Sequence, residues 1–145
     1  MSDGQAAFKP AVPIGPPGED EWCAKEVIGH LLVSNEGINQ QIVEMAGVTS
    51  PIAQHEKVSS MGAQSEADEA LSIDRLRERI AGVFDETQNL VVSLDESDKL
   101  HQQFPHPVFG PLNLKEWIAF HRIHAMDHIQ QIDKIKSDPA YPQAT

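Results

Sequence analysis

Apolar and polar positions repeat with helical spacing in three long segments of the chain: Cys23–Ala46, Ser72–Leu94 and Asn113–Lys136. In each segment, apolar side chains recur every three or four residues, which places them on one face of a helix. No segment shows the strict alternation that is typical of a strand. The pattern predicts an all-α fold in which three amphipathic helices share one core.

Proline and glycine set the limits of these helices. Residues 1–19 contain four prolines and three glycines, which predicts a flexible arm without a helix. We expect the helical domain at residues 20–137 and a flexible tail at residues 138–145. The segment 48–71 has the composition of a loop, and its length indicates either a crossover between distant helices or a cover over a site. A Pro-rich loop is expected at 104–111.

The starts of two helices carry capping signals. Asn113 is a good N-cap for the last helix, and Glu116 is its capping-box partner. At the first helix, Cys23 takes the cap position where Ser is usual, and we expect it to act as a small cap substitute more than as a reactive thiol. Glu26 is able either to close the capping box there or to bond to the distal nitrogen of His30.

One face of the last helix combines a core seam with histidines. Its side chains are Leu114, Trp117, His121, His124, His128, Gln131 and Ile135. The ends of this face are apolar and its middle is polar, although a buried face disfavours polar groups that nothing satisfies. A transition metal would satisfy two or three imidazoles at once. The face therefore suggests a metal site inside a helical bundle.

His124 and His128 are four residues apart, so their imidazoles project from consecutive turns. This spacing holds Zn, Ni, Mn or Fe in many helical sites. The zinc-protease pattern is excluded, because Ala125 stands where the catalytic Glu would follow the first His. His30, in the middle of the first helix, is the best candidate for a third ligand.

The remaining polar candidates receive other roles. His121 lies about 10 Å from His128 along the helix axis, so the three histidines of this face cannot all bind one ion. We expect His121 to contact a bound cofactor from the pocket. Gln131 is expected beside the ion, as a catalytic residue that orients a bound water or substrate. Three further histidines, His55, His101 and His106, are expected in loops and are disfavoured as ligands.

Charge and composition exclude several classes of function. The chain has 145 residues and a formal net charge of -11, which argues against nucleic acid or an anionic membrane as a partner. The single cysteine excludes an internal disulfide and a Cys-rich zinc module. No apolar run approaches the roughly 20 residues of a membrane span, and no signal-peptide pattern is present. We therefore expect a cytoplasmic protein that acts on a small molecule.

Two blocks of the sequence resemble signatures of the DinB/YfiT-like superfamily. The segment Glu21–Leu31 is similar to the pattern W-S-x-x-E-x-x-x-H-L, with Cys23 in place of Ser. The segments His106–Trp117 and His124–Ile132 are similar to H-P-x-F-G-x-L-T-L-x-E-W followed by H-x-x-x-H-x-x-Q-I. The order and the separation of the blocks also agree, and the resemblance covers residues 20–136.

The resemblance implies an up-down helical bundle in which one His of an early helix and two of the last helix bind a divalent metal. Carried onto this sequence, the ligands are His30, His124 and His128. It also implies a thiol-dependent transferase or isomerase, since family members of known function mostly use bacillithiol, mycothiol or glutathione. A metal with three neutral imidazole ligands keeps open positions and lowers the pKa of a bound thiol or water.

The chain departs from the family pattern before its first block. A further long helix is usual there, whereas this sequence has the Pro- and Gly-rich arm. Three amphipathic helices would leave an apolar groove uncovered. We expect the arm or a second subunit to cover it, most simply in a two-fold homodimer, unless the gene begins upstream.

Two other interpretations of the histidines stay open. In a non-catalytic helical module they could bind metal in a structural role or be only a degenerate remnant of a site. Alternatively, the chain could bind a small molecule without turnover. A closed four-coordinate site would favour the structural role. An open position in a solvent-connected pocket would favour catalysis.

Overall fold

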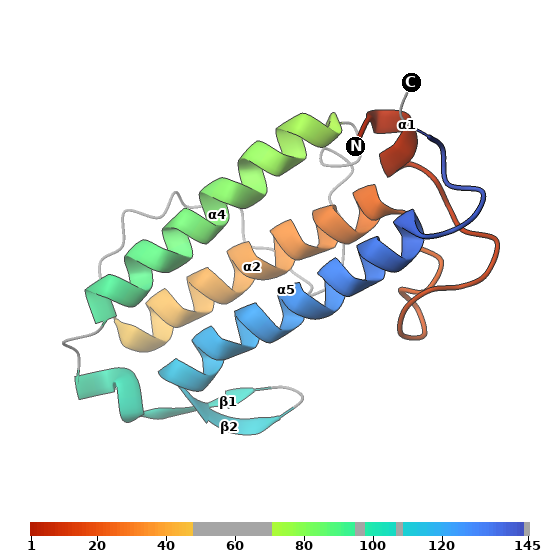
Figure 1. The fold of residues 1–145 in the computed structure, drawn as a ribbon. Helices are drawn as coiled ribbons and strands as arrows, with labels where there is room; N and C mark the ends of the chain where they lie inside the picture. The colour runs from red at the N-terminus through yellow and green to blue at the C-terminus, as the bar shows by residue number, and fades with distance from the viewer. Residues whose placement is uncertain (48–70, 95–97, 107–108, 144–145) are drawn as a thin grey trace.

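The computed structural model describes residues 1–47, 71–94, 98–106 and 109–143. Its body consists of three long helices, α2 (Ala24–Ala46), α4 (Ile73–Leu94) and α5 (Leu114–Lys136). α2 packs against both of the others. α4 runs in the same direction as α2, and α5 runs in the opposite direction (Figure 1). The predicted all-α bundle is confirmed, with its long helices at the expected positions.

The two capping signals produce the expected helix starts. Asn113 Oδ1 accepts from Glu116 N–H at 3.0 Å, and Glu116 Oε2 accepts from Asn113 N–H at 2.7 Å. At α2, Glu26 Oε2 accepts from Cys23 N–H at 2.7 Å, so Glu26 takes the capping role of the two considered for it. α2 ends at Gly47, whose φ of 62° is a left-handed C-cap that glycine adopts without steric cost.

The buried faces match the predicted stripes. On α4 the buried residues are Ile73, Leu76, Val83, Thr87, Leu90 and Leu94. On α5 they are Leu114, Trp117, His121, Ala125, His128, Gln131 and Ile135, with His124 half-buried. α2 is buried on most of its circumference because it contacts both other helices, and Ser34, Asn35 and Asn39 are buried with its apolar side chains.

The core consists of two apolar clusters. The first is formed by Ile38, Ile42, Ala46, Leu90, Leu94, Leu100, Leu114 and Trp117. The second is formed by Ala6, Ile28, Leu32, Ile73, Leu76 and Val83. On α2, polar side chains lie between residues of the two clusters, and Asn39 Nδ2 donates to the carbonyl of Val83 on α4 at 3.3 Å. Asn35 Oδ1 lies 2.5 Å from His121 Nδ1, so the polar middle of the buried α5 face meets polar side chains of α2.

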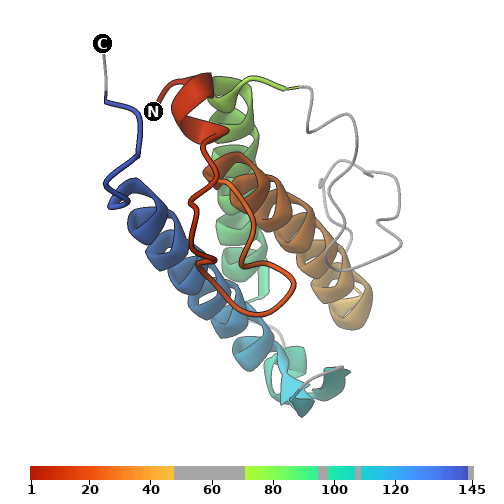
Figure 2. The same cartoon turned by 90° about the vertical axis from the view of Figure 1, so that its right-hand side faces the viewer.

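The N-terminal arm contains a short helix, α1 (Asp3–Ala6), so the expectation that residues 1–19 contain none was wrong. Its prolines begin only at Pro10, and Ser2 and Gln5 form a capping box of their own. Asp3 Oδ1 accepts from Ile73 N–H at 2.7 Å, so α1 caps α4. The remainder of the arm crosses in front of α2 and α5 (Figure 2).

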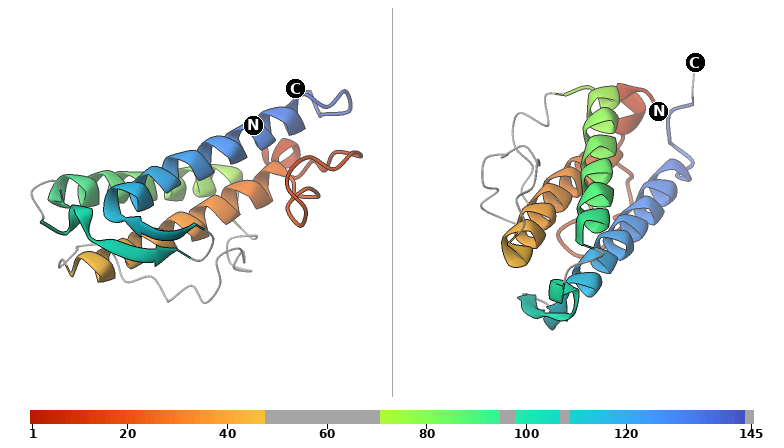
Figure 3. Two further views of the ribbon diagram at one scale, coloured as in Figure 1. Left: turned by 90° about the horizontal axis from the view of Figure 1, so that it is seen from below. Right: turned by 90° about the vertical axis from the view of Figure 1, so that its left-hand side faces the viewer.

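The Pro-rich segment before α5 is a hairpin, which the sequence pattern did not predict. β1 (Gln103–His106) and β2 (Gly110–Asn113) pair antiparallel, with Phe104 opposite Leu112. A 3-10 helix, η1 (Asp98–His101), precedes them. Each strand has four residues and contains a proline. Strands this short do not show the alternation of apolar and polar residues. A two-stranded ribbon tolerates proline because both of its strands are edge strands. The hairpin and the arm lie at opposite ends of the bundle (Figures 1 and 3).

Several expectations fall outside the described residues. They concern the loop at 48–71, apart from its last residue, and His55 within it. The domain limits at residues 19/20 and 137/138 stay predictions, although the arm and the tail meet where Gln5 Nε2 donates to the carbonyl of Pro142 at 2.9 Å. Among the described residues, no helix has the length and apolar character needed to cross a bilayer.

Candidate metal centre

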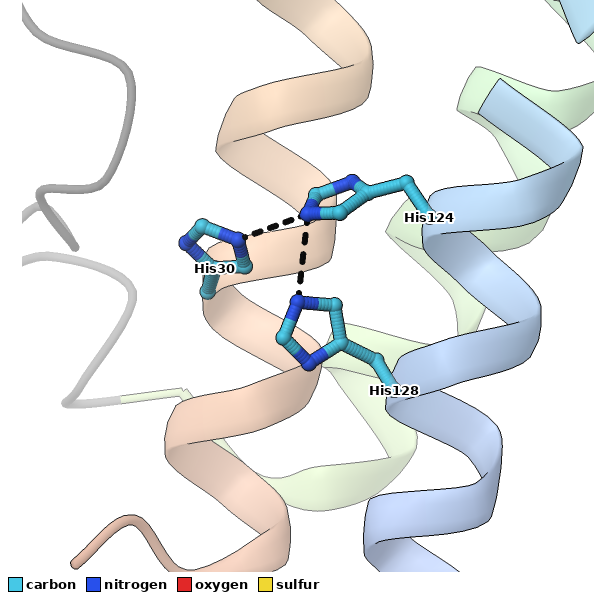
Figure 4. Close-up of side chains that lie close together, drawn as sticks. All are labelled: His30, His124 and His128. Carbon is cyan, nitrogen blue, oxygen red and sulfur yellow. Dashed lines mark hydrogen bonds between the residues drawn. The ribbon is translucent and has the colours of Figure 1, made fainter. Parts of the chain in front are cut away.

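Three histidines from two helices face one point in the structure. His30 projects from α2, and His124 and His128 project from the antiparallel α5 (Figure 4). Nε2 of His124 lies 3.1 Å from Nε2 of His30 and 3.1 Å from Nε2 of His128. The three ligand atoms lie within 4.8 Å of one another. The fold therefore brings together the three residues that the sequence proposes as metal ligands, here called the triad.

These separations fit a single metal ion. Zinc–nitrogen bonds are about 2.0–2.1 Å long, so two nitrogens at octahedral to tetrahedral angles are about 2.9–3.4 Å apart. The two measured separations of 3.1 Å lie inside this range. Neutral imidazoles are ligands that Zn, Ni and Fe share. The donor set thus suits a divalent transition metal.

The protonation of the three rings also calls for a cation. Gln131 Nε2 donates to the carbonyls of Ile14 and Glu19, each at 2.8 Å. This use of both amide hydrogens assigns Oε1 as the acceptor from His128 Nδ1–H at 2.9 Å. In the tautomer that binds a metal, His128 then presents the lone pair of Nε2 toward Nε2 of His124. A hydrogen on His124 Nε2 can bond to only one of the two neighbouring Nε2 atoms. One metal ion, in contrast, accepts the lone pairs of all three nitrogens.

Burial keeps two of these rings neutral at physiological pH. The pKa of His30 and that of His124 are lowered to about 4, mainly by desolvation and to a smaller extent by the neighbouring His128. Nδ1 of His30 and Nδ1 of His124 have no hydrogen-bond partner within the described part of the chain. Near neutral pH, protons therefore compete only weakly with a metal for the imidazoles of His30 and His124.

A family model described as the DinB superfamily matches residues 1–132. The chain belongs to the DinB superfamily. Among curated proteins, the uncharacterized protein YuaE of Bacillus subtilis (strain 168) is 26% identical over an alignment of 132 positions, which covers 83% of this chain and 80% of YuaE. The resemblance deduced from the two sequence blocks is thus confirmed. The match begins at residue 1, so the arm of this DinB-superfamily chain lies inside the matched region.

Gln131 contacts the proposed ligand His128 on the side away from the triad. Its carbonyl fixes the ring, and its amide joins that ring to the arm at Ile14 and Glu19. Such an outer partner sets the tautomer and the orientation of a metal-binding His. The structure thus gives Gln131 a positioning contact, and the catalytic role expected for it stays a prediction.

His121 lies outside the triad, in the interface between α5 and α2. It is buried, and its Nδ1 lies 2.5 Å from Oδ1 of Asn35. Its Nε2 has no hydrogen-bond partner among the described residues. Desolvation lowers the pKa of His121 to about 4, with a smaller contribution from His124. The contact with a cofactor expected for His121 stays a prediction.

The other described histidines lie at the hairpin end. His106 is buried on β1 against the rings of Trp117 and Phe120, with centroid distances of 4.7 and 5.0 Å. His101 is exposed on η1. Neither belongs to the group of three that is placed to hold an ion. The expectation that these two histidines lie in loops was wrong, because His101 is part of η1 and His106 is part of β1.

A pocket of about 470 Å³ lies beside the triad, between the arm and α5. Its lining residues are Ile14, Gly15, Pro16, Glu19, His124, Asp127, His128, Gln130, Gln131 and Lys134. Two of the three proposed ligands are therefore accessible from a pocket that is able to hold a small molecule. The sequence did not indicate that the arm forms one wall of this pocket, because no spacing rule links residues 14–19 to α5.

Replacing Gln131 with Leu tests its contact with His128. The change removes the acceptor at His128 Nδ1, so we expect metal affinity to fall about 10–100-fold, as is typical when a metal-binding His loses its outer partner. Saturating metal should still fill the site. Zinc titration calorimetry measures the affinity, and Gln130→Leu is the control because Gln130 is an exposed neighbour on the same helix. Equal affinities for the two variants would refute the positioning contact.

Proposed function

We propose that this chain binds a divalent transition metal through His30, His124 and His128 and acts as a thiol-dependent transferase or isomerase on a small molecule. The observation that carries the proposal is the convergence of three imidazole nitrogens beside a pocket of about 470 Å³. Nε2 of His124 lies 3.1 Å from each of the other two nitrogens. When bound, such an ion lowers the pKa of a thiol and so supplies a nucleophilic sulfur at neutral pH.

The pocket offers one positive charge to a thiol that carries a carboxylate, such as glutathione or bacillithiol, beside the two carboxylates that also line it. Lys134 is the single cationic side chain among the lining residues that the structure describes. It lies six residues, about 9 Å along the helix axis, from His128, so it is placed to pair with a carboxylate some distance from the sulfur. Asp127 and Gln130 add polar contacts on the same helix. His121 would affect the pocket indirectly, through the packing of α2 against α5.

The proposal includes a cytoplasmic homodimer. Ile123, Met126 and Ile129 on α5 are 58%, 48% and 53% exposed, and their succession on one helix gives an apolar surface that a second copy is suited to cover. Sedimentation velocity at micromolar concentration measures the oligomeric state. A monomer at all concentrations would refute the dimer and leave the metal proposal intact.

The function is tested with protein purified without a histidine tag. Elemental analysis should find about one transition metal per chain, as expected for one three-histidine site. The metal-loaded protein is then assayed with bacillithiol, mycothiol or glutathione and an electrophilic acceptor. We expect metal-dependent transfer with at least one of these thiols. Stoichiometric metal without turnover would favour a non-catalytic metal-binding module.

A further inference from the structure

A loop of the arm is docked against the proposed metal centre. Residues 14–20, here called the arm loop, are closed by the hydrogen bond from Ile14 N–H to the carbonyl of Asp20 at 2.8 Å. Gln131 holds the loop by donating to the carbonyls of Ile14 and Glu19, each at 2.8 Å. Gly15 has a φ of 141°, and a Cβ there would lie 2.5 Å from Gln131 Nε2. The approach of the arm loop to α5 thus requires glycine.

The arm loop presents a carboxylate to the triad. Oε2 of Glu19 lies 3.8 Å from Nε2 of His128, and the Glu19 side chain is 29% exposed. Nδ1 of His128 is occupied by its contact with Gln131 Oε1, so Nε2 is the nitrogen of His128 that is left for a metal. A carboxylate oxygen and an imidazole nitrogen are both atoms that bind transition metals, so an ion placed between them would be bound by both.

The separation is one that two ligands of a single ion adopt. Two donor atoms that are each about 2.1 Å from a metal are about 3.0 Å apart when the angle at the metal is a right angle. They are about 4.2 Å apart when the metal lies in line between them. The measured 3.8 Å falls inside this interval. Glu19 does not belong to the set of mutually close donors formed by the three histidines, so its side chain must turn further toward the triad to bind the same ion.

We propose that Glu19 is a fourth protein ligand of the metal centre and that it couples metal binding to docking of the arm loop. The inference rests on the proposed function in one respect only, namely that the triad binds a metal. The ion would draw the carboxylate inward, and Gln131 would hold the rest of the arm loop beside His128. An ion that accepts five or six ligands keeps positions for a substrate in the adjoining pocket.

The ligand role of Glu19 is tested by Glu19→Gln, with Glu21→Gln as the matched control. Both variants lose one negative charge on the arm, and Glu21 is exposed. Cobalt(II) is the probe, because its absorption bands report the number and type of ligands. We expect Glu19→Gln to change the bands and to weaken binding at least about tenfold, the lower end of what loss of a supporting group costs a metal site. Glu21→Gln should do neither.

Coupling is tested by hydrogen exchange of the arm loop with and without zinc. The amides of Ile14 and Glu19 are hydrogen-bonded within the loop, and zinc should slow their exchange in the parent protein. We expect this slowing to be lost in Glu19→Gln. It should also be lost in Gly15→Ala, which displaces the loop and keeps the carboxylate.

The outcomes separate this inference from the proposed function. Identical cobalt bands and affinities in Glu19→Gln and Glu21→Gln would overturn the ligand role, even if the triad binds metal and thiol transfer is observed. If zinc does not change the hydrogen exchange of the arm loop in the parent protein, the coupling is overturned. Absence of metal binding in the parent protein would instead refute the proposed function itself.

Discussion

Replacing His124 with Ala should abolish metal binding at ordinary concentrations. His124 Nε2 lies 3.1 Å from the ligand nitrogens of both other histidines, so its loss leaves two donors on different helices. Structural zinc sites have apparent binding free energies of about 10–16 kcal/mol. One ligand of three accounts for roughly 4 kcal/mol of this, which corresponds to about a 1,000-fold loss of affinity. Competition titration with a chromophoric zinc chelator measures the change.

His101→Ala is the matched control for this prediction. His101 is exposed on η1, at the hairpin end of the molecule, so its replacement removes an imidazole without touching the triad. His128→Ala should reproduce the effect of His124→Ala. Zinc affinity that stays within about threefold of the parent value, less than 1 kcal/mol, in either triad variant would eliminate the three-histidine site.

The triad could be predicted because it depends on two local rules and one resemblance. Helical spacing alone places His124 and His128 on one face, and the same rule keeps His121 out of reach of the same ion. The position of His30 opposite them depends on how α2 packs against α5, which no local pattern determines. The place of His30 in the middle of the first helix made it the best candidate, and the similarity of Glu21–Leu31 to a family signature then implied it as the third ligand.

The surroundings of the triad could not be predicted in this way. Asn35 and Asn39 appear polar in the sequence, yet both are fully buried, because α2 is packed on two sides. The approach of Glu19 to His128 depends on the path of an irregular loop, which leaves no periodic signal. Its clearest local sign is Gly15, whose missing side chain lets the loop meet Gln131. The sequence shows this glycine without showing what it faces.

Three buried histidines in and beside the proposed metal centre should make the metal-free protein labile to acid. Desolvation is the largest cause that lowers the pKa of His30, His121 and His124 from 6.5 to about 4. Between these pH values the unfolded chain binds more protons than the folded one, so the free energy of unfolding rises with pH. The stabilisation is therefore present above pH 6.5 and is lost as the pH falls toward 4.

Urea unfolding of the metal-free protein between pH 7 and pH 5 measures this loss, which we expect to be about 2–4 kcal/mol, because each pKa unit corresponds to 1.36 kcal/mol and the histidines are coupled. His121→Gln is the informative variant, since an amide is able to keep a bond to Asn35 without titrating. It should reduce the slope of the unfolding free energy against pH by nearly one proton. A parent protein whose unfolding free energy is constant over this interval would show that burial of the histidines does not control its stability. Zinc should oppose the loss down to the pH at which protons displace it, because it binds only the deprotonated rings of the folded state.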